Sequence, residues 1–305
     1  MTSGVLVVDK AAGCTSFDVV ALVRKVLRIR RVGHAGTLDP GAVGVLPILI
    51  GEATKLAPHL TGQDKEYVAT IRFGLTTDTQ DLTGRVLAEA TVPPLTRGDL
   101  VQATRAFVGR IRQIPPMYSA VHYEGRRLYE LAREGREVTR EPREVVVHAI
   151  TVEAVSPPTA TLRIVCGKGT YVRTLASDLG AALGCGAAVE RLVRSRVGPF
   201  RLSDALPSGE LATLPDTTVW ARVLPPESAL AGWPRVNLDS RAASAFIHGQ
   251  TVEAPGEGPG LERFVGVHGA EGQFLGVGEL LAGGRWVKPA RILHADRSEP
   301  RVLPA

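Results

Sequence analysis

Apolar and polar positions in the first quarter of the chain follow strand and helix patterns in turn. The short apolar run Gly4–Asp9 predicts a buried strand. Ser16 precedes apolar positions at helical spacing, so we expect it to cap a helix that ends near Ile29. Glycines and prolines over Gly33–Pro47 predict a loop. Apolar side chains then alternate along Tyr67–Phe73, which predicts a half-buried strand.

The same two patterns recur up to residue 196. The predicted helices are Leu100–Val108, Leu128–Arg133 and Thr174–Leu183. The predicted strands are Val145–Val155, Ala160–Cys166 and Arg191–Arg196. Around the middle helix, the proline-containing stretch Ile111–Arg143 is expected to form a loop that stands off the main body.

The composition changes near Leu202, where a proline-rich segment begins that continues to Pro234. Beyond it, Val236–Leu303 is rich in glycine and holds short strand patterns with one helical stretch, Ala242–His248. The strand patterns are Phe264–His268, Gln273–Glu279 and Arg285–Leu293. This part of the chain therefore predicts a small β-barrel-like domain, and we expect a domain boundary at residue 234.

Composition limits the class of protein. Of the 305 residues, 44% are hydrophobic and 22% charged, which is typical of a globular protein and excludes general disorder. The longest apolar stretch, Ala42–Ile50, is too short to span a membrane, and we expect no secretory signal. The three cysteines have no metal-ligand spacing, so we expect no metal site and a reducing, cytoplasmic location.

The charge balance points to a polyanionic partner, although many cytoplasmic enzymes share a mild basic excess. Lys plus Arg number 36 and Asp plus Glu 31, which gives a net charge of +5. Arginines are concentrated between Arg105 and Arg143, where glutamates are interleaved with them. Aromatic residues make up only 5%, which argues against a broad stacking platform for single-stranded nucleic acid.

Gly33–Pro40 holds the most informative carboxylate of the chain. Its sequence is Gly-His-Ala-Gly-Thr-Leu-Asp-Pro, and its glycines allow close approach of the backbone. A carboxylate such as Asp39, held on such a loop, can serve as a nucleophile or a base. An isolated Asp-Pro pair is more often an ordinary turn.

Several motifs together resemble the TruB family of pseudouridine synthases. Gly33–Pro40 resembles the second motif of that family, and Asp9–Gly13 the first, with Ala11 where the family usually has proline. Further resemblances in family order are Asp64–Tyr67, Gln113–Ala120, Gly125–Arg133, Lys168–Leu175 and Arg191–Phe200. Gly276–Glu279 and Lys288–Arg291 resemble a PUA domain less closely.

The resemblance implies a fold and a reaction. The fold would be a mixed α/β pseudouridine synthase fold with a central, largely antiparallel sheet and a small C-terminal β-barrel-like PUA domain. Residues 1–234 would form the catalytic domain, with an RNA-clamping insertion at about 105–143, and residues 235–305 the RNA-binding domain. The reaction would convert uridine to pseudouridine at position 55 in the T-arm of tRNA, and it needs no cofactor and no metal.

The resemblance also implies the residues of the site. Asp39, Arg173 and Tyr67 would be catalytic: Asp39 attacks the ribose, Arg173 pairs with Asp39, and Tyr67 stacks on the base. Both a direct attack and an initial elimination remain open. The residues implied in substrate binding are His34, which replaces the flipped base, Tyr171 and Leu192, which line the uracil pocket, and Lys10, which supports the Asp39 loop or contacts substrate.

Two other functions remain open at this point. The chain could be an RNA-binding and tRNA-folding module whose catalytic step is secondary, or a catalytic subunit that works with a guide RNA and protein partners. The first would keep its function without Asp39. The complete set of insertion motifs favours a stand-alone enzyme, and we expect a monomer whose partner is tRNA and not a membrane.

Overall fold

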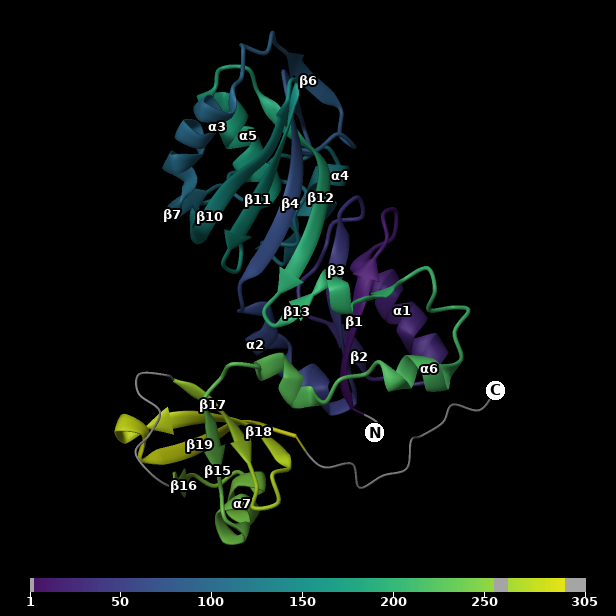
Figure 1. Ribbon diagram of the computed structural model, residues 1–305, viewed down its shortest axis with the longest axis vertical. Coiled ribbons are helices and arrows are strands. Elements are labelled where there is room, and N and C mark those ends of the chain that lie inside the picture. Colours follow the sequence, from purple (N-terminus) through teal and green to yellow (C-terminus); the bar gives the residue numbers. More distant parts are fainter. Residues whose placement is uncertain (1–2, 255–262, 294–305) are drawn as a thin grey trace. The chain divides into compact units, whose positions relative to one another are not determined.

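The computed structural model describes residues 3–254 and 263–293 (Figure 1). The chain forms two compact units. Unit 1 takes the described residues of Met1–Pro40, Gly44–Thr61 and Val197–Ala305, and unit 2 takes Gly41–Val43 and Gly62–Arg196. The predicted boundary at residue 234 therefore lies inside unit 1. No helix in the described ranges has the length and apolar character that crossing a bilayer requires.

The N-terminal part of unit 1 is built on a small sheet. Strand β1 (Gly4–Lys10) pairs antiparallel with β3 (Val43–Ile50), which also pairs antiparallel with β2 (Val32–His34). The short strand β14 (Leu206–Pro207) runs parallel to β1 on its other edge. The predicted strand Gly4–Asp9 is thus confirmed, and its burial follows from having a neighbour on each side.

The predicted loop Gly33–Pro47 was too long at both ends. Strand β2 continues to His34, and β3 begins at Val43 and includes Pro47. Pro47 has no N–H to donate to the sheet, but its carbonyl accepts a hydrogen bond from the N–H of Ala35 at 3.0 Å. The nearly continuous burial of β3 outweighs the loop signal of its glycine and proline.

The predicted helix near the N-terminus exists, but its cap is one residue earlier than expected. Helix α1 (Ser16–Leu27) has Thr15 as its N-cap, in a capping box with Asp18. The spacing of Thr15 and Asp18 fits that box, whereas Ser16 has no acid three residues later. The helix ends at Arg28, whose φ of 54° is left-handed.

The C-terminal part of unit 1 contains a curled sheet of five strands, in the order β15-β17-β18-β19-β16. Its elements are β15 (Arg235–Asn237), α7 (Ser240–Ile247), β16 (Val252–Glu253), β17 (Phe264–His268), β18 (Phe274–Leu281), η5 (Ala282–Gly284) and β19 (Trp286–Ile292). The predicted helix and three strands are confirmed to within two residues. Of the predicted domain Val236–Leu303, residues 255–262 and 294–303 lie outside the described ones.

Shorter helices complete unit 1. After β3 come η1 (Gly51–Leu56) and α2 (Ala57–Thr61). The connection to β15 holds the two-residue strand β13 (Phe200–Arg201), η3 (Leu202–Asp204), α6 (Asp216–Ala221) and η4 (Pro226–Leu230). A shared core includes Val5 and Leu49 from the first sheet and Val277 and Leu293 from the second part. Leu230 belongs to this core, and Leu202 and Trp233 pack against it, so the proline-rich segment runs along the core.

Unit 2 is an antiparallel-rich sheet covered by two helices. The strands lie in the order β12-β4-β11-β10-β7, and α3 and α5 pack against each other and the sheet (Figure 1). The bounds are β4 (Lys65–Phe73), α3 (Arg97–Thr104), η2 (Arg105–Phe107), β7 (Gly109–Gln113), β10 (Arg143–Ser156), β11 (Thr159–Cys166), α5 (Val172–Ala182) and β12 (Ala187–Val197). A separate hairpin joins β5 (Leu75–Thr77) and β6 (Val86–Glu89).

The predicted strand alternation in unit 2 is confirmed. Ala69, Ile71 and Phe73 of β4 are buried in one core with Leu100 of α3 and Leu175 of α5. Strand β12 is longer than the predicted Arg191–Arg196, because its early residues lie in the same core. The largely antiparallel character expected for the central sheet holds for the β4–β11, β11–β10 and β10–β7 pairings.

The predicted loop Ile111–Arg143 is shorter than expected at its start. Residues up to Gln113 belong to β7, which pairs with the first residues of β10. Between these strands lie the short hairpin β8 (His122–Tyr123) and β9 (Arg126–Arg127) and the helix α4 (Leu128–Arg133), whose bounds match the predicted ones. Met117, Leu128 and Leu131 form a small core of their own, which fits a segment distinct from the main core.

Candidate active site

Asp39 lies on the loop between β2 and β3, and its two neighbours in sequence are both anchored. The N–H of Leu38 donates to Ser16 Oγ at 2.9 Å, and that hydroxyl lies 3.2 Å from the carbonyl oxygen of Leu38. On the other side, the carbonyl of Pro40 accepts from the N–H of Gly13 at 2.9 Å. The half-buried Asp39 carboxylate is therefore held on a fixed backbone.

Lys10 ties the same loop to the turn that follows β1. Its side chain is fully buried, and Nζ donates to the carbonyls of Ala11 (2.9 Å), Cys14 (2.8 Å) and Pro40 (3.2 Å). A buried ammonium group needs such acceptors, because removing it from water is costly. These hydrogen bonds link Lys10 to the Asp39 loop, and its role in the reaction stays a prediction.

Arg173 lies in the first turn of α5, which begins two residues before the predicted Thr174 and follows a strand that ends at Cys166. Its side chain is buried, with Nη1 donating to the carbonyl of Thr79 and Nη2 to that of Tyr118, both at 2.7 Å. Asp81 Oδ2 lies 3.9 Å from Nη1. The guanidinium plane is thus fixed by a turn and by the insertion at once.

The turn that holds Arg173 was not recognised from the sequence. Asp81 Oδ1 accepts from Thr79 Oγ1 at 2.7 Å and from the N–H of Thr83 at 3.0 Å, which closes the turn on itself. Gln80, with φ of 62°, places its side-chain oxygen 3.0 Å from Thr174 Oγ1. The run of Asp and Thr at 78–83 is a turn signal that could have identified it.

Tyr171 directly precedes α5 and is positioned through its backbone. The buried amide of Gln113 accepts from the N–H of Tyr171 at 3.0 Å and donates to its carbonyl at 3.2 Å. Gln113 is the last residue of β7. The insertion therefore fixes the start of α5 at two points, through Gln113 and through the carbonyl of Tyr118.

Tyr67 and Leu192 are half-buried side chains on β4 and β12 that pack against the unit 2 core. Two residues before Tyr67, Lys65 lies on the same side of the strand and is buried. Burial, with the charge of Arg194 nearby, lowers the pKa of Lys65 to about 8. Arg194 is also buried. Neither Lys65 nor Arg194 was predicted as a site residue, since burial of a charged side chain depends on distant parts of the chain.

The seven predicted site residues fall into two groups. Lys10, His34 and Asp39 belong to unit 1, with His34 at the end of β2 opposite Ile48 of β3. The others, which belong to unit 2, are Tyr67, Tyr171, Arg173 and Leu192. Within unit 2, Tyr171 and Arg173 lie close together at the start of α5, as its N-cap and in its first turn. The pairing of Asp39 with Arg173 stays a prediction.

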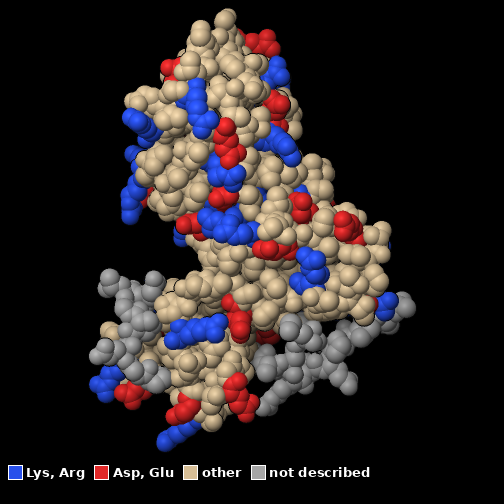
Figure 2. Space-filling view, in the orientation of Figure 1, with Lys and Arg blue, Asp and Glu red and all other residues tan. Residues whose placement is uncertain are grey.

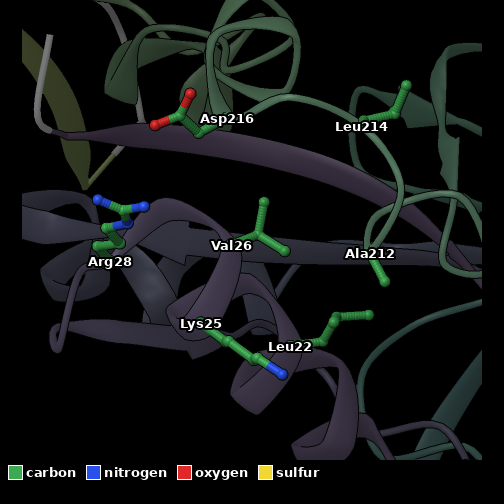
Figure 3. A pocket seen from close by; sticks show the side chains of 7 residues that line it. All are labelled: Leu22, Lys25, Val26, Arg28, Ala212, Leu214 and Asp216. Atoms are coloured by element: carbon green, nitrogen blue, oxygen red, sulfur yellow. The ribbon is translucent and has the colours of Figure 1, made fainter. Parts of the chain in front are cut away.

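A separate pocket of about 350 Å³ lies in unit 1 between α1 and the segment before α6 (Figure 3). It is lined by Leu22, Lys25, Val26, Arg28, Ala212, Leu214 and Asp216. None of the predicted site residues lines it. In the described part of the chain, no three His, Cys, Asp or Glu side chains are grouped as metal ligands.

Family models match almost the whole chain in consecutive segments. The model described as the TruB family pseudouridylate synthase N-terminal domain matches residues 24–172. The tRNA pseudouridylate synthase B C-terminal domain matches residues 173–231, and the model named pseudouridine synthase II TruB, C-terminal, matches residues 234–293.

Curated relatives and solved structures agree with these models. A tRNA pseudouridine synthase B of Symbiobacterium thermophilum is 52% identical over 81% of this chain and 82% of its own length. The Pseudomonas aeruginosa protein of the same name is 42% identical over 96% of both chains. Among solved structures, a chain of a Cbf5-Nop10-Gar1 complex has a TM-score of 0.73 and 26% identity, covering 95% of this chain and 84% of that one.

Proposed function

Because this chain belongs to the TruB family of pseudouridylate synthases, we propose that it isomerises uridine to pseudouridine in tRNA, at position 55 of the T-arm. The predicted fold class, a mixed α/β pseudouridine synthase fold with a smaller C-terminal sheet, is confirmed by the likeness to the Cbf5 complex. The relatives are tRNA pseudouridine synthases, which supports tRNA as the substrate class.

One observation carries the proposed chemistry, which is the double anchoring of the Asp39 loop. A nucleophile works best on a backbone that is held before substrate arrives, because ordering it during the reaction would add to the barrier. The hydrogen bonds to Leu38 and Pro40 hold the backbone on each side of Asp39. Lys10 adds a third link to Pro40.

The proposed reaction balances without a cofactor. The bond between N1 of uracil and C1′ of ribose breaks, the base turns, and C5 bonds to the same C1′. The proton on C5 is released, and N1 takes up a proton. Asp39 would form a covalent bond to the substrate during this exchange. Both direct attack on the ribose and initial elimination satisfy the balance.

The other site residues would prepare the base and the carboxylate. Arg173 would pair with Asp39 and orient it, and Tyr67 would stack on the base beside the sugar. Tyr171 and Leu192 would line the uracil pocket. His34 would fill the space that the uridine leaves, because a base must be extruded from a structured loop before an enzyme can act on it.

The surface charge supports a phosphate-binding role for the insertion. Basic and acidic side chains are interleaved over the face shown in Figure 2. In the segment 105–143, Arg110, Arg126 and Arg140 each pair with a glutamate. Exposed arginines of this segment outside those pairs are candidates for contacts to RNA phosphates, and Arg112 and Arg127 are two of them, beside Arg105, Arg133 and Arg143.

We extend the proposal to the organisation of the protein. Residues 1–234 would form the catalytic domain and residues 235–305 a PUA-like domain that contacts the tRNA. The family models change between residues 231 and 234, close to that boundary. The protein would act as a cytoplasmic monomer. The complexes named for the structural neighbours make this last point worth testing by light scattering.

The proposal is tested by tritium release from T-arm RNA that carries 5-tritiated uridine. The purified chain alone is expected to release the label, because pseudouridine formation must expel the C5 hydrogen. A T-arm transcript with cytidine at position 55 and tritiated uridine elsewhere serves as the control and is expected to stay labelled. Tight RNA binding without release would point instead to a folding module or a missing partner subunit.

The phosphate-binding role of the insertion predicts a salt dependence. The logarithm of the association constant for T-arm RNA should fall linearly with the logarithm of salt concentration, by about 0.7–0.9 per phosphate neutralised. The double substitution Arg112→Ala/Arg127→Ala should reduce that slope by about 1.4–1.8 in filter-binding titrations. An unchanged slope would show that RNA does not contact these two arginines.

A further inference from the structure

Ser208 lies in the proline-rich segment, far along the chain from the predicted site, yet it contacts the turn that supports Asp39. Its side chain is buried, with 7% exposure. The N–H of Ala11 donates to Ser208 Oγ at 2.9 Å, and the N–H of Ser208 donates to the carbonyl of Asp9 at 2.9 Å. Ser208 therefore forms hydrogen bonds to the backbone on both sides of Lys10.

This contact continues to the Asp39 loop through hydrogen bonds. The carbonyl of Ala11, whose N–H is held by Ser208, accepts from Lys10 Nζ. The same Nζ donates to the carbonyl of Pro40, which also accepts from the N–H of Gly13. The last two of these hydrogen bonds join the 10–14 turn to Pro40, the residue that follows Asp39.

The chain on each side of Ser208 is itself fixed. Before it, β14 pairs with β1, with Leu206 opposite Val8 and Pro207 opposite Asp9. After it, Leu211 is fully buried, and Ala212 and Leu214 line the pocket beside α1 shown in Figure 3. The Ser208 hydroxyl therefore belongs to an anchored segment, so its hydrogen bond can restrain the 10–14 turn.

The residue at position 11 determines whether this hydrogen bond can form, because its backbone N–H is the donor. A proline there would have no N–H and would fix its own φ near −65° through its ring. Alanine leaves the turn free to vary, but it supplies the N–H that Ser208 accepts. The hydrogen bond and the ring are therefore alternative restraints on one turn.

We propose that Ser208 is a positioning residue for Asp39, which acts by accepting a hydrogen bond from the Ala11 N–H. It touches neither substrate nor Asp39. This inference rests on the proposed function, because the rate that Ser208 would influence is that of pseudouridine formation.

The test is a double-mutant cycle on single-turnover rates with saturating T-arm RNA. Ser208→Ala is expected to lower the rate about fivefold, since a neutral hydrogen bond is lost and a backbone N–H loses its acceptor. The dissociation constant for RNA should change less than about twofold, since only the carboxylate's position is altered. In the Ala11→Pro background, the same substitution should cost less than about twofold, because the N–H is already absent.

The controls separate this role from general stability. Ser203→Ala removes an exposed hydroxyl that donates to the carboxylate of its neighbour Asp204, and it should keep the full rate. Ser208→Thr keeps the hydroxyl and should recover most of the rate. An equal loss from Ser208→Ala in both backgrounds, or a loss seen only as a lowered Tm, would overturn the proposal.

A measurement on the unaltered protein keeps the inference testable if a variant does not fold. Hydrogen exchange at the Ala11 amide should be slowed to the level of the β1 amides, because the donor is engaged in the native state. Fast exchange there would overturn the proposal whatever the activity. Absence of tritium release by the unaltered protein, with a protected Ala11 amide, would instead count against the proposed function alone.

Discussion

Replacement of Asp39 by Asn is expected to abolish pseudouridine formation while leaving RNA binding almost intact. Asparagine has the shape of aspartate but is not a nucleophile at an anomeric carbon. Loss of the nucleophile in enzymes that form covalent intermediates lowers kcat by about 10⁴-fold or more. The hydrogen bonds that fix the loop come from Leu38 and Pro40, so the backbone should keep its conformation in the variant.

The measurement is tritium release under single-turnover conditions, together with filter binding of the same RNA. We expect no release above background from Asp39→Asn, and a dissociation constant within about threefold of that of the unaltered protein. Asp216→Asn, at an exposed position in unit 1, is the matched control and should release tritium at the normal rate. Parallel loss of binding and release would contradict this prediction, because Asp39 would then contribute to RNA binding and not only to the chemical step.

Local patterns predicted the elements that local interactions determine. The alternation along β4, the bounds of α4 and the strands of the C-terminal sheet follow from residues close in sequence. The errors arose where burial or geometry decided the outcome. Pro47 lies in a strand because β3 has neighbours on both sides, and the cap of α1 is Thr15 because Asp18 completes its capping box.

The site was predictable only as far as its motifs reach. Asp39, Tyr67 and Arg173 could be named because each sits in a recognisable run of residues. The groups that hold the site could not be named, because they are remote in sequence from the residues that they contact. Ser208 is 197 residues from Ala11, and Gln113 is 58 residues from Tyr171. A serine or glutamine carries no sign in the sequence of which backbone group it will meet.

Substitution of Arg173 by Lys is expected to lower the rate about 10²–10³-fold, which is the usual cost of removing one fixed electrostatic contact from a reacting centre. Arginine has five N–H donors in a rigid plane, so it can bond the carbonyls of Thr79 and Tyr118 and keep further donors for the proposed pairing with Asp39. A lysine ammonium is a single point on a flexible stem and cannot span both carbonyls. Lysine keeps the positive charge, so the loss of rate would measure the effect of the arrangement of the donors alone.

The same substitution has a second expected effect that makes the role testable. One of the two carbonyls would lose its donor, at a cost of about 1–3 kcal/mol in the free energy of unfolding measured with urea. Arg97→Lys is the control, since Arg97 also donates to a carbonyl, that of Glu153, but from an exposed position. If Arg173→Lys lowered stability while the rate per folded molecule stayed normal, Arg173 would be a structural arginine. A rate loss that persists where every molecule is folded would assign it to the reacting centre, because α5 would then be intact and only the direction of its donors changed.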